Sequence, residues 1–421
     1  MRRIDVLVTD AGGNHALAVI RSLGRRGIRV AAADTAWTSM GLFSRYCAAR
    51  GVYPDAGGGI GAFRIGLARL VERFRPALLM PMTERTLMAI DTGREGIASR
   101  VRVAPLPPPA TLETAFDKRA TLDLAAAMGI PIPRTCVPAG LRDLEALRGR
   151  LTWPAVIKPR RSERITSDGR IASGGPVEYC FRPEDLEARY RAVHARAPWP
   201  LVQEFIPGEG YGVSALCRQG TVKALFAHRR LRMLRPTGSG STLRESIAPP
   251  PDMAAAARAL LEGLRWHGVA MVEFKRDRRD GLPKLMEING RFWNSLPLAV
   301  AAGVDFPFLL YRLALDGDCP ECLDFRTGVR CRWLAGDARQ LLAVLRGRPA
   351  GWQESFPTRG RAILDFMRPT GRNVHYDDLW PGDPLPFVAA IGGALFRGLP
   401  RLRPDLSRRR PGTVRRAGGG A

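Results

Sequence analysis

Two carboxylates stand inside strongly apolar runs of the sequence, where an unpaired charge is expensive. Glu273 interrupts the run 269–274, and Glu287 interrupts the run 285–288. Side chains alternate between the two faces of a strand, so Glu287 and Asn289 share a face that Glu273 can join from a neighbouring strand. Two carboxylates and an amide oxygen form a hard-oxygen site that suits Mg²⁺ shared with phosphates. The alternative is a solvated sheet face that carries ordinary acids.

Lysines are the second group that could do chemistry. Only five of the 65 basic residues are lysines. Lys158 ends the apolar run 155–158, and Lys118 opens an expected helix at 117–128. A compact ammonium fits around a polyphosphate better than a guanidinium fork does. Each lysine, taken alone, could also be an ordinary surface residue.

The third group is the segment 203–209, in which a predicted strand ends at a Pro-Gly pair with apolar and acidic residues side by side. Its exposed backbone amide and carbonyl groups could pair with the edge of an adenine base. Glu209 could bind ribose hydroxyls. The segment also fits an ordinary strand end.

Taken in order, these features resemble the ATP-grasp superfamily, whose members include biotin carboxylase, the carbamoyl-phosphate synthetase large chain and D-alanine–D-alanine ligase. The features that carry the resemblance are Lys118, Lys158 with Pro159, the segment 203–209, Glu273, and the segment 287–291. The resemblance covers about residues 1–315. One departure is Gly290, where many relatives have proline; the expected metal-binding residues themselves are intact.

The resemblance implies an α/β fold in which an N-terminal parallel-sheet domain, the pre-ATP-grasp domain, precedes a two-subdomain ATP-grasp fold. We expect the N-terminal α/β domain at 1–108 and the ATP-grasp domain at 109–318. A C-terminal extension at 319–400 and a disordered Arg-rich tail at 401–421 would follow. The loop 162–176 would be the flexible flap over the phosphates.

The resemblance also implies roles for single residues. Those expected to bind the nucleotide are Lys118, Lys158, Gly174, Gly175, Glu204, Phe205, Ile206 and Glu209. Those expected to bind one or two Mg²⁺ (or Mn²⁺) ions are Glu273, Glu287 and Asn289. Those expected to be catalytic, at the transferred phosphate or the substrate carboxylate, are Arg291 and Arg230. His228, Arg229 and Arg244 occupy positions where relatives place phosphate- or substrate-binding groups.

The implied function is that of an ATP-dependent ligase. Such an enzyme converts a carboxylate into an acyl phosphate and joins it to an amine, releasing ADP and phosphate. Alternatives are an ATP-grasp carboxylase, a phosphotransferase, or a non-catalytic ATP-binding module at a membrane surface. The identities of the two small-molecule substrates and the oligomeric state do not follow from the sequence.

The elements that position these residues follow from hydrophobic periodicity. Before residue 105 the expected order is strand 4–9, helix 15–26, strand 28–33, helix 62–74 and strand 77–80. This β-α-β order predicts a parallel sheet covered by helices. The further expected strands are 153–158, 177–181, 201–206, 211–217, 221–229, 269–275 and 284–288, and the further expected helices are 183–196 and 252–265.

The first turn, at 10–15, lacks the G-x-G-x-x-G pattern of a dinucleotide-binding unit, so no NAD is expected. Glu84 follows the strand 77–80, and the resemblance places it in the cleft where substrate binds. An alternative for this segment is that Thr83 caps a helix.

Composition excludes several other classes of function. The net charge is +25, but the arginine skew resembles a coding bias, and no basic stretch alternates with aromatic residues, so no nucleic-acid partner is expected. No apolar run reaches 18 residues and the sequence enters a strand at once, so we expect a cytoplasmic protein without a signal peptide. Cys319, Cys322 and Cys331 lack a fourth zinc ligand nearby and are expected to be reduced thiols.

The C-terminal residues allow two interpretations. The apolar segment 386–396 is followed by eight arginines before residue 417, and such a pair of segments could lie on an anionic membrane. We favour a packing helix with a solvated tail. Residues beyond about 400 contain too little apolar surface to fold alone and are expected to be dispensable for ATP-dependent chemistry.

Overall fold

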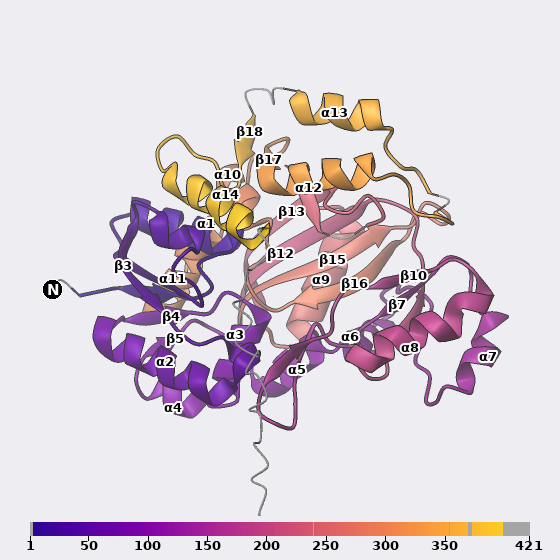
Figure 1. Ribbon diagram of the computed structural model, residues 1–421. Coiled ribbons are helices and arrows are strands. Elements are labelled where there is room, and N and C mark those ends of the chain that lie inside the picture. The colour runs from indigo at the N-terminus through magenta and orange to yellow at the C-terminus, as the bar shows by residue number, and fades with distance from the viewer. Residues whose placement is uncertain (1–2, 239, 353, 369–372, 399–421) are drawn as a thin grey trace, which may run out of the picture.

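The computed structural model describes residues 3–238, 240–352, 354–368 and 373–398 (Figure 1). The N-terminal domain is built on a five-stranded sheet in the order β3-β2-β1-β4-β5. Its strands are β1 (Val6–Val8), β2 (Val30–Asp34), β3 (Cys47–Val52), β4 (Leu78–Met80) and β5 (Arg102–Val103). Every pairing in it is parallel, as the β-α-β order predicted.

Helices complete this domain, with α1 on one face of the sheet and α2 on the other. They are α1 (Asn14–Arg25), η1 (Met40–Phe43), η2 (Ala56–Gly58), α2 (Ile60–Phe74), α3 (Glu84–Asp91) and α4 (Arg94–Ala98). The sheet is closely packed because β1 and β4 are fully buried, with no polar side chain to solvate. Thr83 accepts a hydrogen bond from the Thr86 amide at 3.2 Å, so it caps α3 and fixes the residue that follows it.

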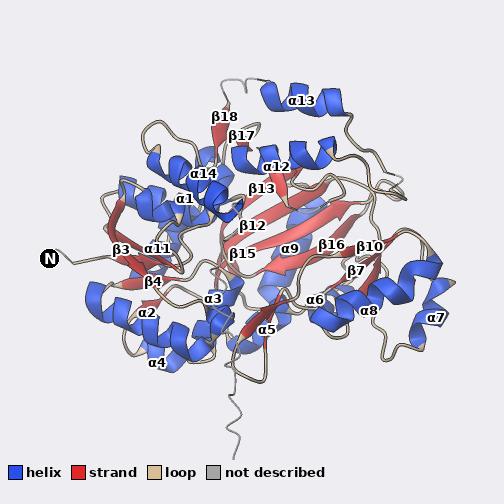
Figure 2. Ribbon diagram, in the orientation of Figure 1, coloured by secondary structure: helices blue, strands red, loops and turns tan. Residues whose placement is uncertain are grey.

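A small four-stranded sheet follows, in the order β10-β7-β11-β6. Its strands are β6 (Thr135–Cys136), β7 (Ala155–Lys158), β10 (Glu178–Cys180) and β11 (Leu201–Glu204). The helices α7 (Asp143–Arg148) and α8 (Leu186–Arg196) pack together beside it, and η3 (Pro183–Asp185) precedes α8. Figure 2 shows this unit as a separate lobe at one side of the molecule. Its core is a cluster of its own.

The largest sheet has seven strands in the order β16-β15-β12-β13-β14-β17-β18. They are β12 (Gly210–Arg218), β13 (Thr221–Met233), β14 (Ser241–Ser246), β15 (Gly268–Arg276), β16 (Pro283–Asn289), β17 (Arg330–Arg332) and β18 (Val374–Tyr376). Helix α9 (Pro251–Gly263) covers one face over β12 and β13, and α5 (Pro109–Phe116) and α6 (Lys118–Ala127) pack against β16 (Figure 2). The last two strands come from residues 319–400, so this segment shares a sheet with the residues before it.

The flap segment 162–176 forms a two-stranded hairpin of β8 (Glu163–Ile165) and β9 (Ile171–Ser173). The remaining helices are α10 (Leu296–Ala302), α11 (Phe306–Asp316), α12 (Leu334–Leu345), α13 (Arg359–Met367) and α14 (Leu385–Gly398). Helix α14 lies against η1, so this helix from the C-terminal extension packs on the N-terminal domain (Figure 1). The tail 401–421 lies outside the described residues.

Buried polar groups hold the C-terminal segment in place. Arg244 in β14 and Asp377 after β18 are both about 1% exposed, and Arg244 Nη2 donates to Asp377 Oδ1 and Oδ2 at 2.8 and 2.6 Å. Asp383 accepts from Arg21 Nε at 3.0 Å and from Ser44 Oγ at 2.7 Å. These pairs tie residues 377–383 to both the large sheet and the N-terminal domain.

Within the described ranges, no helix on its own has the length and apolar composition needed to cross a bilayer, although the bent pair α10 and α11 passes by those two criteria taken together.

Candidate functional site

The two carboxylates singled out in the sequence lie directly opposite each other. β15 and β16 pair in antiparallel fashion with Glu273 opposite Glu287, and Asn289 lies two residues beyond Glu287, on the same face of the sheet. Asn289 Nδ2 donates to Glu273 Oε1 at 3.2 Å. The alternation of side chains along the strands therefore brings the three expected metal ligands together.

Cations surround this acidic group. Arg230 on β13 forms an ion pair with Glu273, and Lys118 Nζ lies 3.6 Å from Glu287 Oε2. Arg291 Nη2 donates to Asn289 Oδ1 at 3.1 Å. Lys118 begins α6 because Asp117 caps that helix by accepting hydrogen bonds from the amides of residues 119 and 120. Since α6 packs against β16, its first residue lies beside Glu287.

The charge of Glu287 depends on these neighbours. Burial alone would raise the pKa of its carboxyl group, but Lys118, Lys158 and Arg291 outweigh that effect and lower the pKa below its usual value. The side chain is 31% exposed, whereas that of Lys118 is 15% exposed. Glu287 is therefore ionised at neutral pH and reachable from solvent.

Lys158 is placed at the edge of the small sheet, at the end of β7. Its Nζ donates to Gln203 Oε1 at 2.6 Å, and Gln203 Nε2 donates onward to Thr135 Oγ1 at 2.8 Å. Burial lowers the pKa of Lys158 to about 8, despite the opposing charge of Glu287. The ammonium is thus held by a buried amide and carries most of its charge at pH 7.

The expected adenine hinge follows β11. Glu204 is fully occupied by the protein, because Oε1 accepts from the Arg134 amide at 2.7 Å and Oε2 pairs with Arg279 at 2.9 Å. The Phe205 amide donates to Pro154 O at 3.3 Å. The Ile206 carbonyl accepts from Lys275 Nζ, and burial lowers the pKa of that lysine to about 8. The carboxylate of Glu204 therefore holds this segment in place, and hydrogen bonds within the protein occupy the Phe205 amide and the Ile206 carbonyl.

Glu209 lies beyond the hinge, on the solvent-exposed approach to β12. Its Oε2 accepts from the Tyr211 hydroxyl at 3.0 Å. The carboxylate is therefore oriented but remains accessible for hydroxyl donors.

An aromatic cluster beside the hinge was missed by sequence reasoning. Trp352, 4% exposed, contacts Phe205, Tyr179 and Phe181, with ring centroids 5.5, 5.4 and 6.3 Å away. Glu354 forms an ion pair with Arg278 close by. The segment around Trp352 comes from the C-terminal extension and has no periodic pattern, so only its rare residue type could have marked it.

The flap hairpin is attached to the N-terminal domain. Arg85 of α3 pairs with Glu163 of β8 at 3.1 Å, and the Ile60 amide donates to Gly169 O at 2.9 Å. A Cβ atom at Gly174 would lie 2.5 Å from Arg161 O, so only glycine fits there, and Gly175 has a φ of +78°. The two glycines thus shape the end of the flap, and Lys118 Nζ reaches its start by donating to Ser162 Oγ at 3.1 Å.

The chain is similar to a known protein family and to several solved structures. Residues 196–337 match a family described as ATP-grasp in the biosynthetic pathway with Ter operon. The solved biotin carboxylase domain of Hydrogenobacter thermophilus 2-oxoglutarate carboxylase superposes with a TM-score of 0.61 at 14% identity, over 78% of this chain and 74% of that one. The chain has the ATP-grasp fold. No curated protein matches it in sequence.

Two further ATP-grasp neighbours are ligases or synthetases by name. N5-carboxyaminoimidazole ribonucleotide synthetase of Thermus thermophilus has a TM-score of 0.57 at 19% identity, over 77% of this chain and 82% of that one. L-amino acid ligase of Bacillus licheniformis has a TM-score of 0.54 at 18% identity, over 75% of each chain. At these identities the likeness establishes the fold.

The acidic group formed by Glu273, Glu287 and Asn289 fits a divalent cation. Glu273 and Glu287 face each other with Asn289 beside them, and all three offer hard oxygen atoms. The described residues hold no cluster of three or more His, Cys, Asp or Glu side chains suited to a metal. A site of two carboxylates suits Mg²⁺, which commonly takes its other ligands from water and substrate phosphates.

Other candidates from the sequence lie elsewhere in the ATP-grasp fold. Arg244 is buried with Asp377, which takes it away from any phosphate, and Arg229 pairs with Glu245 at 2.7 Å. His228 is buried beside Ser295, and burial lowers its pKa well below the usual value, so the ring is neutral. Cys319, Cys322 and Cys331 are free thiols.

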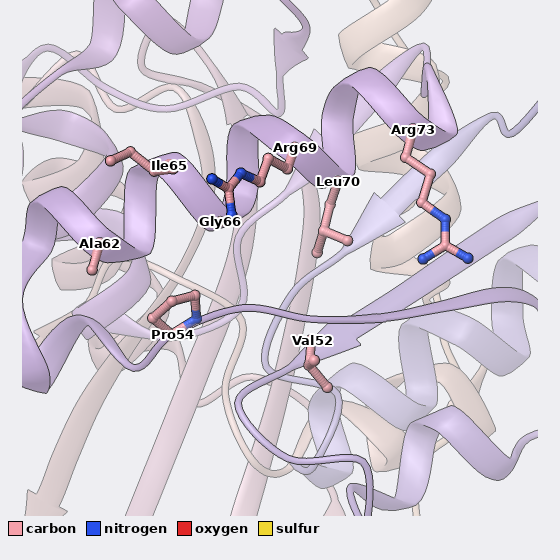
Figure 3. Close-up of a pocket in the computed structure, with 8 residues that line it drawn as sticks. All are labelled: Val52, Pro54, Ala62, Ile65, Gly66, Arg69, Leu70 and Arg73. Atoms are coloured by element: carbon pink, nitrogen blue, oxygen red, sulfur yellow. The ribbon is translucent and has the colours of Figure 1, made fainter.

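A shallow depression on the outer face of the N-terminal domain is separate from this site (Figure 3). It lies between α2 and the end of β3, and Arg69 and Arg73 project beside it (Figure 3). Its lining contains no acid and none of the residues expected to bind nucleotide or metal. We therefore assign it no part in the chemistry.

Proposed function

We propose that this protein is an ATP- and Mg²⁺-dependent ligase that activates a carboxylate as an acyl phosphate and joins it to an amine. The observation that carries the proposal is the pair Glu273 and Glu287, facing each other on neighbouring strands with Lys118 3.6 Å from Glu287. Two carboxylates beside a lysine suit a metal-bound polyphosphate better than they suit a solvated sheet face.

The nucleotide would lie between the small sheet and the large sheet. Lys118 and Lys158 would bind its phosphates, and the flap with Gly174 and Gly175 would cover them. The segment 204–206, which the side chain of Glu204 holds in place, would lie against the adenine base. Glu209 would bind the ribose hydroxyls.

Glu273, Glu287 and Asn289 would hold Mg²⁺, which supplies charge neutralisation to the triphosphate. In the first step a carboxylate oxygen of the acid substrate attacks the γ-phosphorus, a new O–P bond forms, and ADP leaves as its bond to that phosphorus breaks. Arg291 and Arg230 would stabilise the negative charge on the transferred group. Catalysis at this step rests on positioning and electrostatic stabilisation.

In the second step the amine nitrogen attacks the acyl carbon, phosphate leaves, and the amine loses a proton. The acyl phosphate survives only if water is excluded. The flap hairpin, which is attached to the N-terminal domain through the ion pair of Arg85 and Glu163 at 3.1 Å, would exclude it. The partners are thus a small carboxylic acid and a small amine, and the proposed compartment is the cytoplasm.

Calorimetry with ATP and Mg²⁺ tests the proposal directly. We expect binding that requires Mg²⁺ and weakens at least tenfold in Lys118→Ala, because a charge next to the phosphates is lost. Lys223→Ala is the matched control, since Lys223 pairs with Asp318 at 3.3 Å, outside this site. Absence of binding by the intact protein would contradict the assignment.

A carboxylase and a non-catalytic module remain the rival functions. A carboxylase would show ATP cleavage that depends on bicarbonate rather than on an amine, so a phosphate-release assay with each substrate separates the two. The non-catalytic module is disfavoured by the arrangement around Glu287, where the charges of Lys118, Lys158, Arg291 and Arg230 overcome the effect of burial and lower the pKa of the carboxyl group.

A further inference from the structure

Trp352 belongs to the C-terminal extension, yet its side chain is buried against the small sheet. The segment between α12 and α13 extends toward the side of the molecule that carries β7 and β10 (Figure 1). There the indole ring meets Tyr179 in β10 and Phe181 directly after it, with interplanar angles of 88° and 87°. It meets Phe205, which follows β11, at 81°. Edge-to-face geometry is favoured for aromatic pairs, so Trp352 joins the ends of two strands of the small sheet.

Trp352 is held in this position from both sides along the chain. Gly351 before it has a φ of +81°, and a Cβ atom there would lie 2.9 Å from Phe181 Cγ. Glu354, two residues after it, forms an ion pair with Arg278 in the turn between β15 and β16. The indole Nε1 is buried with no hydrogen-bond partner in the described ranges, so the side chain acts through the contacts of its ring.

The Phe205 ring is enclosed by groups from three parts of the chain. The ring centroids of Trp352 and Tyr179 lie 5.5 and 6.1 Å from its own. Lys275 Nζ of β15 lies 4.7 Å from the centroid of the Phe205 ring and donates to the Ile206 carbonyl. Phe205 is only half-buried, so removal of the indole would free its ring to turn. The backbone on either side of Phe205 therefore depends on Trp352 for its position.

The residues expected to bind phosphates are held by other groups. Lys118 Nζ donates to Ser162 Oγ at 3.1 Å, and Lys158 Nζ donates to Gln203 Oε1 at 2.6 Å. Neither partner belongs to the aromatic cluster around Trp352. A change at Trp352 should therefore affect the binding of the base and leave the binding of the phosphates as it is.

We infer that Trp352 is a positioning residue for the nucleotide base: it holds Phe205, and through it the segment 204–206, in the conformation that receives adenine. This inference rests on the proposed function. Trp352 lies beyond residues 196–337, the part that matches the ATP-grasp family, so the C-terminal extension of this chain completes the nucleotide site. Without Trp352, binding of ATP would have to order a loosened segment, and that ordering costs affinity.

The test compares MgATP with magnesium tripolyphosphate, which carries a triphosphate chain but no base, by calorimetry on the full chain. Trp352→Leu keeps an apolar side chain and removes the ring. We expect it to raise the Kd of MgATP at least about fivefold, because the ring contacts are lost and Phe205 is loosened. The Kd of tripolyphosphate should stay within about twofold, since its site shares no partner with Trp352. Trp352→Phe retains a ring and should bring the Kd of MgATP to within about twofold of the wild type.

Trp380 provides the matched control, because it is a second tryptophan of the C-terminal extension and stacks on Tyr46 of the N-terminal domain at 5.9 Å. Trp380→Leu should leave both affinities within about twofold of the wild type. Tryptophan fluorescence gives a second readout. MgATP should change the emission of the wild type, and this change should be lost in Trp352→Phe and retained in Trp380→Phe.

Equal weakening of MgATP and tripolyphosphate binding in Trp352→Leu would overturn the inference, because it would show that Trp352 supports the fold as a whole. Unchanged MgATP affinity in this variant would overturn it as well. Thermal unfolding shows whether Trp352→Leu is folded. If it is not, the fluorescence comparison decides, and a MgATP-induced change that persists in Trp352→Phe overturns the inference.

Failure of the proposed function looks different. Hydroxylamine traps an acyl phosphate as a hydroxamate. A protein that shows the expected difference between MgATP and tripolyphosphate, but forms no hydroxamate from the carboxylic acids supplied, would refute the ligase proposal and leave the role of Trp352 standing. An intact protein that binds no MgATP would contradict both.

Discussion

At the scale of single residues, the properties of the site come from cations arranged around two carboxylates. Glu287 faces Lys118, and Glu273 pairs with Arg230 and receives the Asn289 amide. A carboxylate in such surroundings keeps its charge when it is partly withdrawn from water. The consequence is that the pKa of the Glu287 carboxyl group lies below its usual value.

Glu287→Gln should lower the rate of ATP-dependent acyl phosphate formation by at least 100-fold while Tm changes by only about 3 °C. The substitution removes a ligand charge without changing the shape of the side chain. Hydroxamate formation and thermal unfolding measure the two effects. Glu262→Gln on the exposed side of α9 serves as the control. Melting of Glu287→Gln with activity retained in Glu273→Gln would show that the pair is structural.

Lys158 should make nucleotide binding take up a proton near pH 8. Burial lowers its pKa to about 8 from an ordinary 10.5, so a fraction of free protein is neutral there, and bound phosphates favour the charged form. Calorimetry in buffers of different ionisation enthalpy measures the uptake. Lys158→Arg should abolish it, whereas Lys275→Arg separates the contribution of the other lysine with a pKa of about 8. Equal uptake in Lys158→Arg would exclude this role.

The same shift has a consequence for folding. The unfolded chain holds the Lys158 proton up to about pH 10.5, while the folded chain releases it near pH 8. Between these values the unfolded state binds more protons, so the contribution of this residue to stability rises with pH. Below pH 8 the buried charge is a cost that Gln203 and Glu287 only partly offset. The burial of this lysine therefore lowers the stability of the folded protein below pH 8.

At the scale of elements, the attachment of the flap hairpin to the N-terminal domain should affect how much ATP is lost to hydrolysis instead of ligation. Arg85 and Glu163 are 31% and 18% exposed, and a partly exposed ion pair contributes up to about 1 kcal/mol. We expect Arg85→Ala to raise ATP hydrolysis relative to ligation by about two- to fivefold, because an open flap admits water. Phosphate release with and without amine measures the ratio. Arg100→Ala, which breaks the exposed pair with Glu72 in the same domain, is the control.

Strands with continuous apolar runs were predictable, and those without them were not. The fold class and the strands β12, β13, β15 and β16 follow the sequence prediction, although β13 extends to Met233 beyond the expected end at 229. β3 and β17 were missed. β3 alternates exposed and half-buried positions, and β17 carries an arginine on each side of Cys331. Such strands are stabilised by backbone pairing with a neighbouring strand, β2 for β3 and β14 for β17.

The candidate site was also predictable only in part. The acidic pair could be predicted because the alternation of side chains on adjacent strands fixes the face on which it lies. Lys118 and Lys158 could be predicted because Lys118 begins a helix and Lys158 ends a strand. Trp352 could not be predicted, because it reaches the hinge from a segment far along the chain. Neither could the pairing of Arg244 with Asp377, which are 133 residues apart in sequence. Long-range polar pairs leave no local pattern.

At the scale of the whole molecule, the C-terminal segment is an integral part of the structure. Asp377→Ala should lower the free energy of unfolding by about 3–5 kcal/mol, because it leaves the charge of buried Arg244 unpaired. Urea unfolding measures the change. Asp324→Ala, at an exposed position of the same segment, should alter it by less than about 0.5 kcal/mol. Equal stability of the two variants would show that β18 is only loosely attached.

The contact of Asp383 with Ser44 has a consequence for synthesis of the protein. The two residues are 339 positions apart in the chain. At roughly 5–20 residues per second of translation, the ribosome needs about 20–70 s to make the residues between them. During that time the N-terminal domain emerges with η1 uncovered, since α14 has not yet been made. A growing chain therefore presents this face to chaperones and to other nascent chains until α14 has been made.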